Sequence, residues 1–227
     1  MTKHTIIFKS VSARAGEKTA VTGANISVSS GELVLLIGAN GSGKSTFVNA
    51  FFGHPRYSIT DGEVLFDGEN ITGLSTTEKA RKGMFLSMQH LPEVPGVTLF
   101  QFLYRAHKAL TGETISAVAF HKKIILLAEE IGLKTDFLDK EINHKLSGGE
   151  KKQSELLQLA VLSPKFAFLD EIDSGVDVEA VKAISKTIEH LRKGGTGFLV
   201  ISHNPNICDD LSPDRIYHME DGTIKQK

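Results

Sequence analysis

Residues 38–46 of the sequence read GANGSGKST, and these residue types suit the binding of a polyphosphate. Glycines let the backbone curl so that successive N–H groups point inward at an anion. Lys44 can neutralise the β- and γ-phosphates, and the Ser45 hydroxyl can ligate Mg²⁺. The spacing Gly38-x4-Gly43-Lys44-Ser45 therefore predicts that the chain binds a nucleoside triphosphate.

The residues around this loop support the prediction. The apolar run at 33–37 reads as a strand and residues 44–52 as a helix, so the loop lies at a helix start, where free N–H groups and the helix dipole favour an anion. A glycine- and serine-rich turn with a chance lysine is the alternative, and it does not require these neighbours. The predicted nucleotide contacts here are Gly38, Asn40, Gly41, Ser42, Gly43, Lys44, Ser45 and Thr46.

A second chemical feature is the acidic pair that follows the apolar run FAFL at residues 166–169. Burial of such a strand would fix both carboxylates at its tip. Asp170 would hold Mg²⁺ directly or through water, and Glu171 would polarise the attacking water. Many strands end in acids, so the pair predicts triphosphate hydrolysis only in combination with the Lys44 loop.

Ser147, Gly148 and Gly149 form a second possible anion cradle at a helix start. One domain with one triphosphate site has no evident need for two cradles. The second makes sense if it closes over a nucleotide held by another copy of the chain. An ordinary helix cap followed by a flexible turn is the alternative for these three residues alone.

Composition describes an ordinary globular protein. The chain has 227 residues, of which 41% are hydrophobic and 23% charged, and a net charge of −1, so no basic field points to nucleic acid. Cys208 is the single cysteine, which excludes an internal disulfide. No apolar run is long enough for a membrane span, and the N-terminus lacks the pattern of a signal peptide. We therefore expect a cytoplasmic protein with no direct membrane insertion.

Apolar runs and turn residues predict strands and helices that alternate. Strands are predicted within residues 5–37 and at 63–68, 84–88, 166–169, 197–201, 215–219 and 223–224. Helices are predicted at 44–52, 76–82, 150–162 and 178–192, and residues 91–145 are predicted to form an all-helical insertion. Prolines and a glycine within residues 91–96 argue against a strand there, and Asp61–Gly62 is predicted as a turn.

Strands that alternate with helices form a doubly wound α/β sheet, and ligands bind at the carboxyl ends of its strands. Gly38, Gln89, Asp170 and His203 all follow predicted strands. We therefore expect these residues to meet at one edge of the sheet.

Taken together, the motifs resemble those of the ATP-binding-cassette (ABC) ATPases. They occur in that family's order: residues 38–46, Gln89, 146–150, 166–171, 174–177 and His203. The resemblance implies a P-loop NTPase core with an antiparallel β subdomain and an inserted α-helical subdomain. It places the core at residues 1–90 and 146–227 and the helical subdomain at 91–145 of a single domain.

The same resemblance implies a transient head-to-tail dimer that holds two ATP molecules and Mg²⁺. Gln89 would contact Mg²⁺ or the attacking water, Asp177 would couple the two sites, and His203 would sense the γ-phosphate. Glu171 would be the catalytic base, and Ser147 with Gly148 and Gly149 would close over the partner's nucleotide.

Several segments resemble the SufC group of this family more closely, namely residues 53–62, 88–97, 147–152, 169–177 and 212–215. SufC proteins are the ATPases of an iron–sulfur cluster assembly system, with SufB and SufD as scaffold partners. The resemblance implies that residues 89–97 and the helical insertion present the partner surface. The alternatives are the ATP-binding subunit of an ABC membrane transporter, and a nucleotide-responsive binding module with negligible turnover.

Two departures from the family pattern and two further predictions complete the sequence-based picture. Glu150 stands where most cassettes have glutamine, and residues 11–15 lack the aromatic that stacks on adenine in many cassettes. Lys152 is predicted to pair with Glu171 in the resting monomer, which would keep the base out of position. Cys208 is predicted to be a plain buried thiol rather than an iron ligand.

Overall fold

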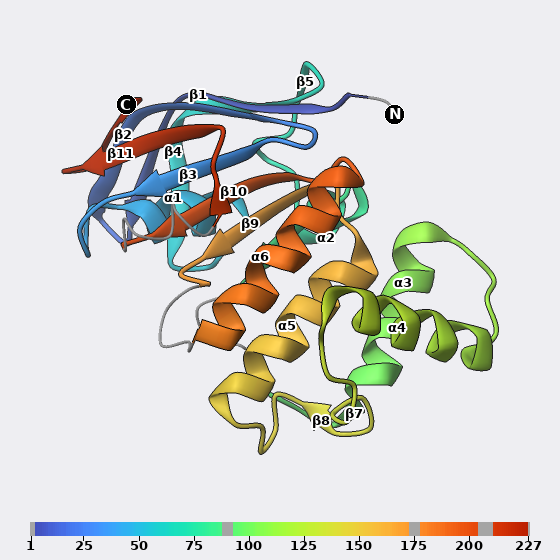
Figure 1. Ribbon diagram of the computed structural model, residues 1–227. Coiled ribbons are helices and arrows are strands. Elements are labelled where there is room, and N and C mark those ends of the chain that lie inside the picture. Colours follow the sequence, from blue (N-terminus) through green and yellow to red (C-terminus); the bar gives the residue numbers. More distant parts are fainter. Residues whose placement is uncertain (1–2, 88–92, 173–177, 204–210, 227) are drawn as a thin grey trace.

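The computed structural model describes residues 3–87, 93–172, 178–203 and 211–226. Its centre is a six-stranded sheet in the order β12-β11-β3-β10-β9-β6, in which all neighbours except the β11–β12 pair are parallel. Figure 1 shows this sheet between the antiparallel strands above and the helices below. The bounds are β3 Leu33–Ile37, β6 Met84–Ser87, β9 Phe166–Asp170, β10 Gly197–Ser202, β11 Arg215–Glu220 and β12 Thr223–Gln226.

A four-stranded antiparallel sheet, in the order β2-β1-β4-β5, forms the β subdomain. Its strands are β1 Thr5–Ala15, β2 Lys18–Ser29, β4 Tyr57–Phe66 and β5 Glu69–Asn70. Helix α1 (Lys44–Phe51) packs against it, and a phenylalanine cluster fills the space towards the central sheet. In this cluster the Phe8 ring lies 4.7 Å from Phe47 and 5.2 Å from Phe51, which anchors the helix that follows the phosphate loop.

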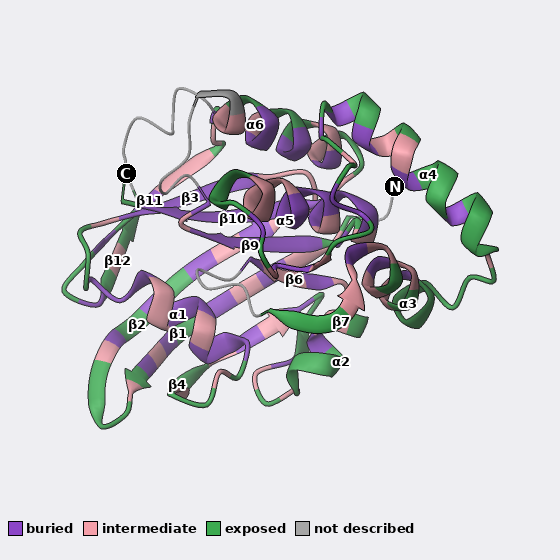
Figure 2. Ribbon diagram, turned by 90° about the horizontal axis from the view of Figure 1, so that it is seen from below, coloured by how far each residue is buried: buried purple, intermediate pink, exposed green. Residues whose placement is uncertain are grey.

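The other face of the central sheet is covered by helices. Alternate residues of β3 face opposite sides: Leu33 and Leu35 join the core under the helices, whereas Val34 and Leu36 join the phenylalanine cluster. Because both faces are covered, the strands are continuously apolar. Figure 2 shows them as buried beneath α5 and α6. The remaining helices are α2 Thr76–Arg81, α3 Leu99–Thr111, α4 Ala117–Ile131, α5 Gly148–Leu162 and α6 Val178–Lys193. No helix in the described part of the chain is long and apolar enough to cross a membrane.

The inserted segment is helical in α3 and α4, but the prediction that it is entirely helical was wrong. Strand β7 (Val94–Thr98) pairs with β8 (Glu141–Ile142) and contains Pro95 and Gly96. The ladder joins only Val94 to Ile142 and Thr98 to Glu141, with a register shift between them. Proline is tolerated because this irregular, exposed pairing does not use its missing N–H.

Residues Asp61–Gly62 are also not the predicted turn, because they lie inside β4. The pairing of β1 with β4 shifts register between Lys9 and Ser12, opposite this point. Gly62 has φ of 82°, and a side chain there would collide with the backbone of β1. The glycine therefore serves a bulge within a strand, a feature that looks like a turn in sequence alone.

Candidate functional site

The loop between β3 and α1 is built so that its backbone can wrap an anion. Gly43 is the cap residue of α1 and has φ of 110°, a value that side-chain-bearing residues rarely adopt. A Cβ on Gly43 would collide with the carbonyl oxygen of Ala20, and one on Gly38 with that of Met219. Close backbone approach therefore requires glycine at both positions, and at Gly43 the backbone conformation requires it as well.

Lys44 closes the loop on itself. Its Nζ donates to the carbonyl oxygens of Gly38 at 2.7 Å and Ala39 at 2.9 Å. Burial lowers the pKa of Lys44, while the nearby carboxylates of Glu171 and Asp170 act in the opposite direction. The ammonium group therefore lies in the loop that would hold the phosphates, with two acidic neighbours.

Two observations show that a polyphosphate fits this loop. The buried Ser42 hydroxyl has no hydrogen-bond partner among the described residues, which is costly unless a ligand satisfies it. Among the described residues, the Lys44 ammonium donates hydrogen bonds only to backbone carbonyls, so it can turn towards a more negative partner.

The Mg²⁺ ligands predicted from sequence are adjacent. Ser45 at the start of α1 donates its hydroxyl to Asp170 Oδ1 at 3.1 Å, across the tips of β3 and β9. A hydroxyl and a carboxylate are oxygen ligands that Mg²⁺ accepts, with phosphate oxygens and water completing its shell. These two residues therefore fit a Mg²⁺ ion, which would neutralise the triphosphate when bound.

Burial raises the pKa of Asp170 to about 6, with the Ser45 hydrogen bond and Lys44 lowering it and Glu171 raising it. The folded protein then binds more protons than the unfolded chain between pH 4 and 6. The stabilisation from this group is present below its unfolded pKa and is lost as pH rises through about 6. At neutral pH the charged carboxylate costs stability until a cation arrives.

Asp170→Asn is therefore expected to stabilise the nucleotide-free, metal-free protein by about 1–3 kcal/mol at pH 7.5, since two pKa units correspond to about 2.7 kcal/mol. Below about pH 3 the difference should vanish, because the aspartate is then neutral in both the folded and the unfolded chain. Urea unfolding in EDTA at a series of pH values measures this gap. A gap that stays constant with pH would show that the Asp170 carboxylate is not destabilised by burial.

Glu171 and His203 lie beside this centre. Glu171 follows β9 with φ of 51°, a left-handed conformation held in part by its N–H donating to the Ile201 carbonyl at 3.0 Å. His203 Nδ1 lies 3.6 Å from Glu171 Oε1, and the Glu171 side chain is largely buried. A carboxylate next to the magnesium ligand and a histidine is positioned to accept a proton from water.

Two predicted contacts, Gln89 and Asp177, lie outside the described residues, as does Cys208. For the rest, the structure brings together the Lys44 loop, Ser45, Asp170, Glu171 and His203 at one edge of the central sheet. That edge is where the carboxyl ends of β3, β9 and β10 meet, as the strand pattern predicts.

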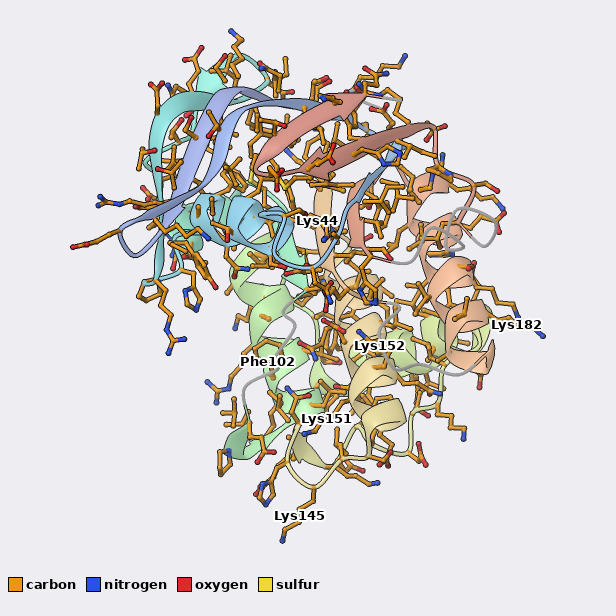
Figure 3. All side chains as sticks on the ribbon, turned by 90° about the vertical axis from the view of Figure 1, so that its left-hand side faces the viewer. Lys44, Phe102, Lys145, Lys151, Lys152 and Lys182 are labelled. Carbon is orange, nitrogen blue, oxygen red and sulfur yellow. The ribbon has the colours of Figure 1, made fainter. Side chains whose placement is uncertain are left out.

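Ser147, Gly148 and Gly149 are separate from this cluster. They are exposed at the start of α5, where the Ser147 hydroxyl accepts from the Glu150 N–H at 3.3 Å and the Glu150 carboxylate accepts from the Ser147 N–H at 2.9 Å. Figure 3 places Lys145, two residues before Ser147, at the bottom of the view and Lys44 above the middle. One chain therefore presents the two anion cradles at distinct places.

The start of helix α5, which we call the signature helix, is fixed by hydrogen bonds within the chain itself. The reciprocal bonds of Ser147 and Glu150 make a capping box. Lys140 Nζ also lies 2.6 Å from Glu150 Oε1, and this hydrogen bond, followed by those of Ser147, lowers the pKa of Glu150 to about 2. Glu150 thus fixes the helix start, which gives a physical role to the residue that departs from the common glutamine.

The predicted pairing of Lys152 with Glu171 was wrong. Lys152 Nζ forms an ion pair with Glu155 Oε2 at 2.9 Å, three residues further along α5. The two residues share a helix face, and Glu155 is buried, so the carboxylate holds the lysine locally. The role of Glu155 was not predicted from sequence, although its place one turn before Leu159 on an apolar stripe marks it as a buried carboxylate.

Comparison with known proteins agrees with this geometry. The family model described as ABC transporter matches residues 12–174. This chain belongs to the ABC family. A probable ABC transporter ATP-binding protein of Streptococcus pyogenes is 40% identical over 209 residues, covering 91% of this chain and 82% of that protein. The match establishes an ABC-type ATPase.

Other relatives agree. A probable ATP-dependent transporter, ycf16, of the alga Antithamnion is 37% identical and covers 95% of this chain and 88% of its own length. Among solved structures, an ATP-binding cassette of an ABC transporter superposes with a TM-score of 0.78 at 26% identity, covering 98% of this chain and 90% of its own. A dimeric bacterial ABC transporter cassette superposes with a TM-score of 0.84 at 22% identity, covering 98% and 97%. The ABC fold, with its antiparallel β subdomain and helical region, is confirmed.

Proposed function

We propose that this ABC ATPase works as a transient head-to-tail dimer that closes on two Mg-ATP molecules and drives a change in an attached partner. The observation that carries the proposal is the separation of the two anion cradles. The Lys44 loop and Asp170 surround one site, whereas Ser147 projects an exposed, capped helix start elsewhere on the same chain. Two copies that exchange these helix starts complete two sites.

In the proposed site the loop N–H groups, Lys44 and Ser45 hold the triphosphate. Mg²⁺, held by Ser45 and Asp170, would supply charge neutralisation, with Gln89 as a further proposed contact. Glu171 orients and deprotonates water against the γ-phosphate, with His203 beside it. Ser147, Gly148 and Gly149 of the second copy stabilise the negative charge that develops on the γ-phosphate as it is transferred to water. Asp177 is proposed to couple the two sites.

We place the binding site for the partner in a groove of about 730 Å³, called the partner groove below. It lies between the core and the inserted helical segment, and its lining residues include Phe52, Pro55, Ala80, Phe85, Phe102 and Leu110. Their apolar character suits an inserted helix or loop of another protein. The groove reaches both α1 and α5, so its occupant contacts the helices that bear the phosphate loop and the signature.

Two kinds of partner are proposed, and different observations favour each. The names that the relatives carry favour a membrane transporter, for which this chain would be the ATP-binding subunit. The SGGEKK run at residues 147–152 and the segment at 53–62 favour a SufB/SufD-type scaffold of iron–sulfur cluster assembly. In both cases ATP binding favours the closed dimer, and hydrolysis reopens it.

Affinity purification of the tagged chain from its native cell extract tests the proposal, with soluble and detergent-solubilised membrane fractions kept apart. A scaffold recovered from the soluble fraction supports cluster assembly, and a permease supports transport. Phe102→Asp, which puts a charge into the groove, should abolish recovery, whereas Leu126→Asp on the exposed face of α4 should not. Equal recovery of the partner by both variants would show that the partner binds outside the groove. Phosphate release from ATP is measured on the same protein, and its absence would leave only a nucleotide-responsive binding module.

A further inference from the structure

Glu155 is a buried carboxylate that neither the phosphate chemistry nor the dimer surface uses. The residue is 3% exposed, and both of its oxygens are engaged. Oε1 accepts the Ser87 hydroxyl at 2.5 Å, and Oε2 lies 2.9 Å from Lys152 Nζ. Burial of a carboxylate costs free energy unless the group is paired and hydrogen-bonded. Ser87 and Lys152 together offset that cost for Glu155.

The two bonds of Glu155 differ in what they connect. Lys152 belongs to the same helix, α5, and neutralises the charge locally. Ser87 is 68 residues away in the sequence and is the last residue of β6, the edge strand that pairs with β9. The hydrogen bond from Ser87 therefore joins the signature helix to the central sheet, next to the strand whose tip carries Asp170.

The helix transmits this attachment to its exposed end. Eight residues separate Glu155 from Ser147, and at a rise of about 1.5 Å per residue this corresponds to roughly 12 Å of rigid helix. Figure 3 shows Lys152 between Lys44 and Lys151 in the view. A small tilt of α5 about this anchor moves Ser147 by ångströms, enough to spoil its fit to a phosphate.

We propose that Glu155 is a positioning residue: by latching α5 to the end of β6 it sets where Ser147 stands relative to the core, and so whether a second copy can close on ATP. The inference rests on the proposed head-to-tail closure. The latch also lies in the wall of the partner groove, because Glu155 is among its lining residues. An occupant of the groove therefore contacts the anchor that orients the signature.

The test compares Glu155→Gln with Ser154→Ala. Glutamine keeps the size of the side chain, but it loses the ion pair with Lys152 and offers the Ser87 hydroxyl a neutral and therefore weaker acceptor in place of a carboxylate. Ser154 is a fully buried neighbour on α5 whose hydroxyl accepts a hydrogen bond from Gln158 of the same helix, so its loss perturbs the helix without touching the latch. A thermal melt of each variant confirms folding. Glu155→Asp, which keeps the charge on a shorter stem, should recover part of the activity.

Three readouts are expected in Glu155→Gln. Hydrogen exchange in the nucleotide-free chain should accelerate at least about tenfold at residues 147–156, with α1 unchanged. The Kd for ATP should stay within about threefold, because the phosphate loop is untouched. The kcat for phosphate release should fall at least about tenfold, since closure is impaired.

Unchanged exchange at residues 147–156, or the same kcat as Ser154→Ala, would overturn the latch. A dimerisation assay on a Glu171→Gln background, by sedimentation in Mg-ATP, separates this outcome from failure of the proposed function. If Glu155→Gln shows faster exchange but the Glu171→Gln single variant forms no dimer in Mg-ATP, head-to-tail closure is refuted. The role of the latch in closure is then refuted as well. A dimer that forms equally well with and without Glu155 would refute the latch only.

Discussion

Glu171→Gln is expected to lower kcat for ATP hydrolysis by about 10²–10⁴-fold while the Kd for ATP stays within about threefold. A positioned general base contributes about this factor. Glutamine keeps the size of the side chain and its hydrogen-bonding oxygen but cannot take the proton of the attacking water. Steady-state phosphate release and calorimetric titration with ATP measure the two quantities.

The same substitution should accumulate the closed dimer, since nucleotide would bind but not turn over. Glu189→Gln is the matched control, because Glu189 is an exposed carboxylate on α6 that pairs with Lys193 at 2.7 Å, away from the site. The control should retain the wild-type kcat. A Glu171→Gln protein that keeps more than about a third of that kcat would show that another group accepts the proton.

The parts of the fold predicted from sequence are those whose information is local. The phosphate loop was predictable because a strand, a glycine-rich turn and a helix start lie within one short stretch, and the structure requires glycine at both Gly38 and Gly43. Strand β7 was not predictable, because Pro95 and Gly96 normally exclude a strand. Its pairing depends on Ile142 and Glu141 more than forty residues away, at an irregular edge that needs few backbone donors.

The candidate site also has residues that could be assigned from sequence and residues that could not. Asp170 and Ser45 could be assigned together because each follows a strand of one parallel sheet, and parallel strands share a carboxyl edge. The partner of Lys152 could not be assigned from sequence, because Glu155 and Glu171 both compete for its one ammonium group. Glu155 wins because it is on the same helix and buried, so that leaving it unpaired would cost more than leaving Glu171 without this lysine.

Lys44→Met is expected to raise the Kd for ATP by at least about 10²-fold and to remove hydrolysis, with the fold retained. Methionine keeps most of the apolar stem and removes the cation that donates to the loop carbonyls of Gly38 and Ala39. Because burial lowers the pKa of Lys44, its charge is expensive in the free protein, so the melting temperature should change little or rise. Calorimetric titration and a thermal melt give both numbers.

Lys79→Met provides the contrast for this prediction. Lys79 is also buried and also donates to a backbone carbonyl, that of Phe51 at 2.5 Å, but at the opposite end of α1 from the phosphate loop. Burial lowers the pKa of Lys79 as well, so the melting temperature should again change little, and the Kd for ATP should stay within about threefold. If both lysine variants lost affinity for ATP to the same extent, the binding energy would come from the integrity of α1 and not from charge at the phosphates. The pair therefore separates electrostatic capture of the triphosphate from support of the helix that presents it.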